Sequence, residues 1–124
     1  MIDIAKQIAY WRDGAQEDWA VARELVDRGR SRHGLFFAHL ALEKILKAHV
    51  CAKTQDVAPR VHNLVRLAEQ AGLALNDDQR ATLADVNVYT LAGRYPEMLP
   101  PEPQDARALL NRAGKVFTWL LQKS

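Results

Sequence analysis

Three charged residues interrupt an otherwise apolar stretch of the chain, and their types and spacing make them the first candidates for chemistry. They are Glu43, Lys44 and Lys47. Because a helix turns by about 100° per residue, the three fall in one helical sector roughly 100° wide. Two ammonium groups in such a sector are suited to receiving phosphate oxygens. The alternative is a plain ion pair, because Glu43 precedes Lys47 in the order and spacing that stabilise a helix by about 0.2–0.5 kcal/mol.

Two histidines are secondary candidates for the same site. His39 precedes Glu43 by one helical turn, so a hydrogen bond that polarises its imidazole is feasible, although a structural role is the alternative. His62 is the other candidate. No two of the four histidines show the spacing of a helical metal-ligand pair, and the single cysteine, Cys51, cannot complete a zinc site. We therefore expect no metal and no cofactor, and we interpret Cys51 as a buried, inert thiol.

A second polar set lies near the expected end of a later helix and contains Asn87, Tyr89, Arg94 and Tyr95. The guanidinium of Arg94 offers a planar fork of donors that fits phosphate. Tyr95 beside it could stack on a base or place a hydroxyl in a cleft. The alternative is structural: a helix end pinned by an arginine–carboxylate pair and a rigid turn at Pro96.

A third set is the basic run of Arg28, Arg30, Arg32 and His33. Such a run at a turn is typical of a solvated loop. As a phosphate-binding rim it would give salt-dependent affinity without sequence preference. Aromatic residues that could stack on bases do not alternate with these charges, so sequence-specific recognition of nucleic acid by this stretch is not expected.

The elements that must position these residues are helices, because apolar residues recur every three or four positions. The pattern predicts helices over residues 3–28, 32–53, about 64–72, about 76–91 and about 104 onward. Gly29 is a predicted C-terminal cap and Ser31 an N-terminal cap. Asn76 and Gln79 form a predicted capping box. Residues 96–103 hold four of the five prolines and cannot be helical.

The second predicted helix is apolar nearly all round, which is typical of a central helix in a bundle. Its charged sector is then expected to face a cleft, an ion-pair network or a subunit interface. Strand-like alternation and internal repeats are absent from the sequence. We therefore predict an all-α fold, a single up-and-down bundle of four to five helices that forms one domain over residues 1–124.

Composition limits the class of protein further. The chain has 124 residues, 48% of them hydrophobic, which allows one core and excludes the disordered class. Apolar runs are too short to cross a membrane, and the first residues lack the order of a signal peptide. The single cysteine favours a reducing compartment, so we expect a cytoplasmic protein. A net charge of +2 is too small to indicate nucleic-acid binding by itself.

Short motifs follow one another along almost the whole chain in an order that resembles one known family. They are Trp11 and Trp19, the stretch 36–48, His62-Asn63-Leu64 after Pro59, and Tyr89 with Arg94-Tyr95-Pro96. In this order they resemble the HEPN family, in the subgroup often described as DNA-binding or nucleotide-binding.

The resemblance implies a fold, partners and two kinds of activity. HEPN domains are helical bundles that commonly form homodimers, and many act with a minimal nucleotidyltransferase as a toxin–antitoxin pair. A tyrosine hydroxyl in the second polar set could then accept a nucleotidyl group from that partner. Other members are metal-independent ribonucleases, whose signature is an arginine followed a few residues later by a histidine. The corresponding place here holds Arg94, and no histidine follows it.

Three functional hypotheses result. The first is a non-catalytic module that binds nucleotide or RNA phosphates with Lys44, Lys47 and Arg94 and works beside a nucleotidyltransferase. The second is a metal-independent ribonuclease, for which His39 or His62 would have to lie close to Arg94 as the general base. The third is a homodimeric interaction scaffold, in which Glu43 is paired across or within the helical seam.

Overall fold

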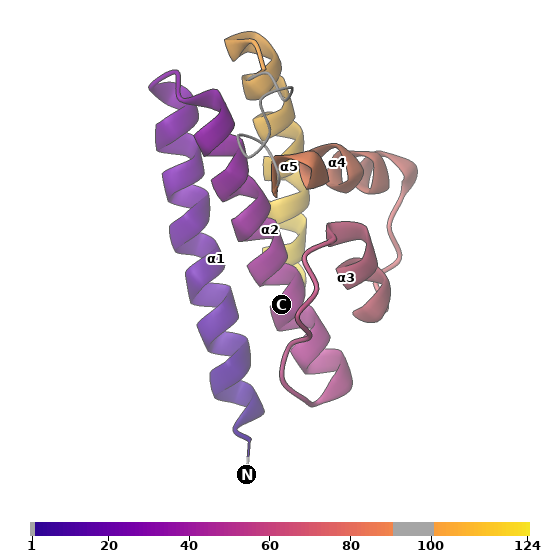
Figure 1. Cartoon of the computed structure of the whole chain (residues 1–124). Helices are drawn as coiled ribbons and strands as arrows, with labels where there is room; N and C mark the ends of the chain where they lie inside the picture. The colour runs from indigo at the N-terminus through magenta and orange to yellow at the C-terminus, as the bar shows by residue number, and fades with distance from the viewer. Residues whose placement is uncertain (1, 91–100) are drawn as a thin grey trace.

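The computed structural model of the chain describes residues 2–90 and 101–124. These residues form helices α1 (Ile4–Asp27), α2 (Ser31–Thr54), α3 (Leu64–Gln70), α4 (Asp77–Asn87) and α5 (Pro103–Lys123), with a short 3-10 helix η1 (Val88–Thr90) (Figure 1). No strand occurs in these two segments. The predicted all-α class is confirmed.

Helix α2 is the centre of the arrangement. It packs against α1, α3, α4 and α5, and Figure 1 shows α1 beside it, α5 behind, and the short α3 and α4 to one side. Apolar residues on several faces of α2 are buried in the core. Leu42, Ile45 and Leu46 have no exposed surface. Leu83 of α4 and Leu120 of α5 complete the same cluster. A helix buried nearly all round is what its apolar circumference predicts.

The turn between α1 and α2 follows from two glycines. Gly29 has a φ of 80° and forms a Schellman motif, because its N–H donates to Val26 O and that of Arg30 donates to Leu25 O. A Cβ at Gly34 would lie 2.5 Å from Val26 Cγ2, so glycine allows α2 to approach α1 closely. These two residues fix how the long helices pair.

Most predicted helix ends agree with the structure, and two details differ. The capping box of Asn76 and Gln79 is confirmed, with both hydrogen bonds formed. Ser31 is not the N-cap of α2; Arg30 holds that position without a side-chain cap. Helix α4 ends at Asn87 rather than near residue 91, because the chain tightens into η1.

Among the described residues, no helix combines the length and apolar character that a membrane crossing requires. Cys51 is buried, as expected from its position on α2.

Candidate functional site

A buried carboxylate organises the most polar part of the interior. Glu43 lies on α2 with 7% of its surface exposed. Its Oε2 accepts a hydrogen bond from Lys47 Nζ at 3.0 Å, which confirms the ion pair expected from the spacing. Its Oε1 lies 3.1 Å from Nδ1 of His62, which belongs to the segment before α3. We call Glu43, Lys47, His62 and the nearby His39 the Glu43 cluster.

Two asparagines hold the segment that carries His62. Asn63 is the N-cap of α3, and its side chain accepts a hydrogen bond from the N–H of Arg66 at 3.1 Å. Asn87, the last residue of α4, donates to Asn63 Oδ1 at 3.2 Å and accepts from the N–H of Leu64 at 2.9 Å. The end of α4 therefore fixes the start of α3 and, next to it, His62.

His62 is the open part of the cluster, because 68% of its side chain is exposed. A carboxylate oxygen accepts hydrogen bonds, so the contact with Glu43 Oε1 favours the forms of His62 in which Nδ1 carries a proton. Nε2 is then left for a ligand. In the neutral ring Nε2 is an acceptor, and in the protonated ring it is a second donor.

His39 lies on the inner side of the cluster. It is 1% exposed, and its Nδ1 is 3.8 Å from Glu43 Oε1, too far for the hydrogen bond that the spacing made feasible. Its Nε2 is buried and has no hydrogen-bond partner in the described residues. Burial lowers the pKa of His39, and the attraction of Glu43 opposes that effect only in part.

Lys47 is enclosed rather than presented to solvent. Its side chain is 8% exposed. The ammonium lies 5.2 Å from the centre of the Trp11 ring on α1, within the range of a cation–π interaction. With Glu43 on one side and the indole on another, Lys47 is a supporting cation of the cluster and not a free phosphate ligand.

Lys44 points to a different neighbour. Its Nζ lies 2.8 Å from Oδ2 of Asp18 on α1, an ion pair that is not aligned as a hydrogen bond. Gly14 makes room for it, since a Cβ at Gly14 would lie 3.2 Å from Lys44 Cδ. The three charged residues that share a sector of α2 are therefore all ion-paired, but in two separate pairs, Glu43–Lys47 and Lys44–Asp18.

The second polar set is divided by the structure. Asn87 contacts the start of α3, as described above, whereas Tyr89 packs against a separate apolar cluster that includes Leu35 and Leu110. Burial raises the pKa of Tyr89, and the nearby carboxylates of Asp105 and Asp85 add to the shift. Arg94 and Tyr95 lie outside the described residues.

The basic run at the turn between α1 and α2 is largely solvated. Arg28, Arg30 and His33 are exposed, and Arg32 is partly buried. Among the described residues none of the three arginines is ion-paired, so the run retains its charge. Arg28 and Arg30 belong to the turn, whereas Arg32 and His33 lie in the first turn of α2. None of the four residues is ion-paired with the Glu43 cluster.

Three residues of this region were not among the candidates from the sequence. Trp11 and Asp18 act across the α1–α2 interface, where no local spacing signals the contact. Asn63 had a local signal, because it precedes an apolar helical segment as an N-cap does. Within residues 2–90 and 101–124 no three His, Cys, Asp or Glu side chains gather closely enough to hold a metal ion.

The geometry defines a small helical bundle with one charged cluster reaching the surface through a histidine. A sequence profile of the HEPN domain matches residues 8–123, and the chain belongs to the HEPN family.

Two solved structures have the same fold. One is ST0689, described as an archaeal HEPN homologue, with a TM-score of 0.73 and 19% identity over 94% of this chain and 96% of that one. The other is TT1696 from Thermus thermophilus, with a TM-score of 0.79 and 17% identity over 95% of this chain and 98% of that one. No curated protein matches the chain significantly.

Proposed function

We propose that this chain is a cytoplasmic, non-catalytic HEPN module that binds nucleotide or RNA phosphates and acts beside a nucleotidyltransferase. The observation that carries the proposal is the pair formed by the buried Glu43 carboxylate and the exposed His62 imidazole, 3.1 Å apart. Removing a charged group from water costs several kcal/mol per ion, so apolar residues of similar volume would often stabilise the fold as well or better. A charged cluster that reaches the surface at one histidine is therefore a candidate for function.

The phosphate-binding residues in this proposal differ from Lys44, Lys47 and Arg94, the set expected from the sequence. Lys44 and Lys47 are both engaged with carboxylates, so the contacting group in the described part of the chain is His62. Its ring, oriented by Glu43, can donate from Nε2 to a phosphate oxygen when it is protonated. Arg94 supplies the second cation in this proposal, as the family resemblance implies, with Tyr95 beside it.

The partners belong to the same proposal. The resemblance to nucleotidyltransferase-associated HEPN proteins supports a toxin–antitoxin-like pair and a homodimer. In that arrangement Tyr95 is the tyrosine that would accept a nucleotidyl group, because it stands next to Arg94 in the sequence, whereas burial and two carboxylates raise the pKa of Tyr89. Incubation with ATP and a nucleotidyltransferase partner, followed by mass spectrometry, would locate the modified residue. Analytical ultracentrifugation would measure the oligomeric state.

The binding test is a titration of a short labelled RNA, and of labelled ATP, at low and high salt with a chelator present. We expect His62→Ala and Arg94→Ala each to weaken binding and to reduce its salt dependence. Arg80→Ala is the matched control, since it removes one exposed cation that pairs with Glu69 away from the Glu43 cluster. Equal loss in all three variants would indicate unspecific attraction and would contradict the proposal.

One observation favours a second candidate, a metal-independent ribonuclease. A neutral His62 that donates from Nδ1 to Glu43 has Nε2 free as a general base for a 2′-hydroxyl. RNA turnover in the presence of a chelator, lost in both His62→Ala and Glu43→Gln, would establish this activity. If neither binding nor turnover is found in folded protein, the paired charges of α2 are structural, and the interaction scaffold becomes the better description.

A further inference from the structure

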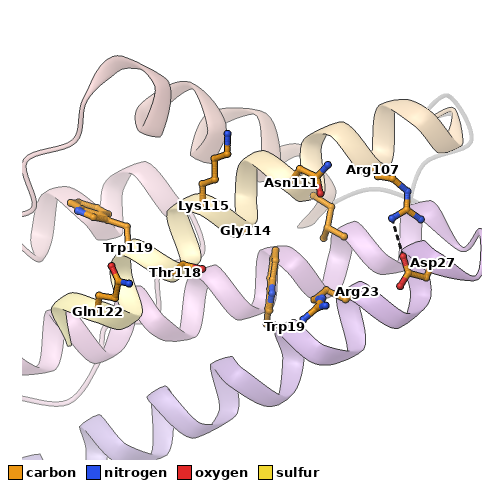
Figure 2. Close-up of a pocket in the computed structure, with 11 residues that line it drawn as sticks. Trp19, Arg23, Asp27, Arg107, Asn111, Gly114, Lys115, Thr118, Trp119 and Gln122 are labelled. Atoms are coloured by element: carbon orange, nitrogen blue, oxygen red, sulfur yellow. Dashed lines mark ion pairs between the residues drawn. The ribbon is translucent and has the colours of Figure 1, made fainter.

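The outer face between α1 and α5 carries a groove that the Glu43 cluster does not use. Its volume is about 680 Å³, within the roughly 300–1,000 Å³ typical of ligand sites. On α5 it is lined by a stripe at helical spacing: Arg107, Asn111, Lys115, Thr118 and Gln122. On α1 the facing stripe is Trp19, Arg23 and Asp27 (Figure 2).

The groove is positively charged. Arg107 lies 2.9 Å from Asp27, and both side chains are more than half exposed, so this ion pair contributes little and can exchange for another carboxylate. Arg23 and Lys115 have no carboxylate within ion-pairing distance in the described segments. Three cations and one acid therefore line the groove, and this excess of positive charge favours an anionic occupant.

The Trp19 ring in the floor of the groove is used for packing and is not presented for stacking on a base. The Trp19 ring is stacked on Phe117, with ring centres 5.0 Å apart and planes inclined by 14°. Its edge abuts Gly114, where a Cβ would lie 3.1 Å from Trp19 Cζ2. One face and one edge of the indole are thus covered by the protein itself, and the ring serves to pack α1 against α5.

The walls favour a peptide. Asn111 and Gln122 present amide groups, and Thr118 a hydroxyl, so each offers both a donor and an acceptor. A peptide backbone has N–H and C=O groups to match them, whereas a phosphodiester backbone has only acceptors. From Arg107 to Gln122 the helix rises about 22 Å, the length of about six or seven extended residues.

We propose that this groove binds an extended acidic segment of a partner protein, with carboxylates on Lys115 and Arg107 and the peptide backbone along Asn111 and Gln122. The Cα atoms of Arg107 and Lys115 are separated by about 12 Å along α5. Two side chains four residues apart on one face of an extended peptide are separated by about 13 Å. The groove therefore selects glutamates at positions i and i+4. This site shares no residue with the Glu43 cluster.

The experiment measures fluorescence anisotropy of a labelled seven-residue peptide that carries glutamates at i and i+4, otherwise neutral. We expect Lys115→Ala and Arg23→Ala each to weaken its binding by about two- to fivefold, as for a partly exposed ion pair. Asn111→Leu, which leaves the charge of the groove unchanged, should also weaken the binding of the peptide. Arg80→Ala, equal in charge change but outside the groove, should leave the affinity unchanged.

Three outcomes would overturn the proposal. One is no binding of the glutamate peptide to the folded wild type. Another is equal affinity for a peptide with adjacent glutamates, because the spacing would then have no role. The third is an oligonucleotide of the same charge that binds more tightly and loses affinity in the same groove variants. His62→Ala leaves peptide binding intact whether or not the phosphate site exists, so the two proposals fail independently.

Discussion

The imidazole Nδ1 of His62 lies 3.1 Å from Oε1 of Glu43, so an exposed ring is oriented by a buried carboxylate 19 residues earlier in the chain. The other oxygen of the same carboxylate holds Lys47. One residue of α2 therefore couples the interior of the bundle to its surface.

Glu43→Gln should lower the free energy of unfolding by about 3 kcal/mol, because it leaves the Lys47 ammonium buried without its counter-charge. Urea denaturation followed by circular dichroism measures the change. The double variant Glu43→Gln/Lys47→Met should be more stable than the single one, since no unpaired charge remains. If both variants lost the same stability, the ion pair would not be the source of the effect.

Stability should depend on pH through His39. Its pKa is lowered from the ordinary value of 6.5 by burial, so the unfolded chain binds the proton at higher pH than the folded one. The stability tied to neutral His39 is therefore complete above about pH 6.5 and decreases as the pH falls below it. His39→Gln should remove this part of the slope in urea denaturation between neutral and mildly acidic pH.

The titration of His39 can also be observed directly. The ring carbon signals of His39 in the folded protein, followed by NMR, should change at lower pH than those of an unfolded peptide containing the same histidine. A midpoint at or above the peptide's value would contradict the lowered pKa. This measurement does not depend on whether the variant folds.

Gly34→Ala should destabilise the bundle by about 1–3 kcal/mol, the usual cost of overpacking a close contact. The new methyl group would meet Val26 Cγ2 at 2.5 Å and the backbone N of Val26 at 3.0 Å. Gly14→Ala is the matched control, because its methyl group meets only the flexible Lys44 side chain and the exchange favours the helix. Thermal unfolding should show a large decrease in Tm for Gly34→Ala and a small change in Tm for Gly14→Ala.

Lys44→Ala should change the free energy of unfolding by less than about 1 kcal/mol, as a partly exposed ion pair does. Phosphate binding should also be retained, because Asp18 already engages this ammonium. The same titration used for His62→Ala tests the second point. A loss of affinity as large as that of His62→Ala would return Lys44 to the phosphate site.

The fold was accessible from the sequence because its signals are local. The apolar period of α2, the glycine at position 29 and the Asn76–Gln79 capping box each act within a few residues, and each is confirmed. The prediction of Ser31 as an N-cap was wrong for a related reason. The Schellman motif at the end of α1 draws Arg30 into the turn, and the first turn of α2 begins at Ser31 without a cap.

The site was less accessible, because its contacts join distant parts of the chain. The Glu43–Lys47 pair was predictable from its spacing and is present. The pairing of Lys44 with Asp18 and the position of Lys47 over Trp11 depend on how α1 lies against α2, which no short pattern reports. The hydrogen bond from His39 to Glu43, which the spacing made feasible, is not formed, since His39 Nδ1 and Glu43 Oε1 are 3.8 Å apart.

The three tryptophans are distributed so that each surface carries its own optical reporter. Trp11 lies against the Lys47 ammonium in the Glu43 cluster, whereas Trp19 and Trp119 line the groove between α1 and α5. The emission of an indole shifts with the charge placed near its ring. A chain that retains only Trp11 would therefore report on changes around the Lys47 ammonium, and one that retains only Trp119 would report on ligands in the groove. Occupancy of the two surfaces can then be followed separately, without an added label.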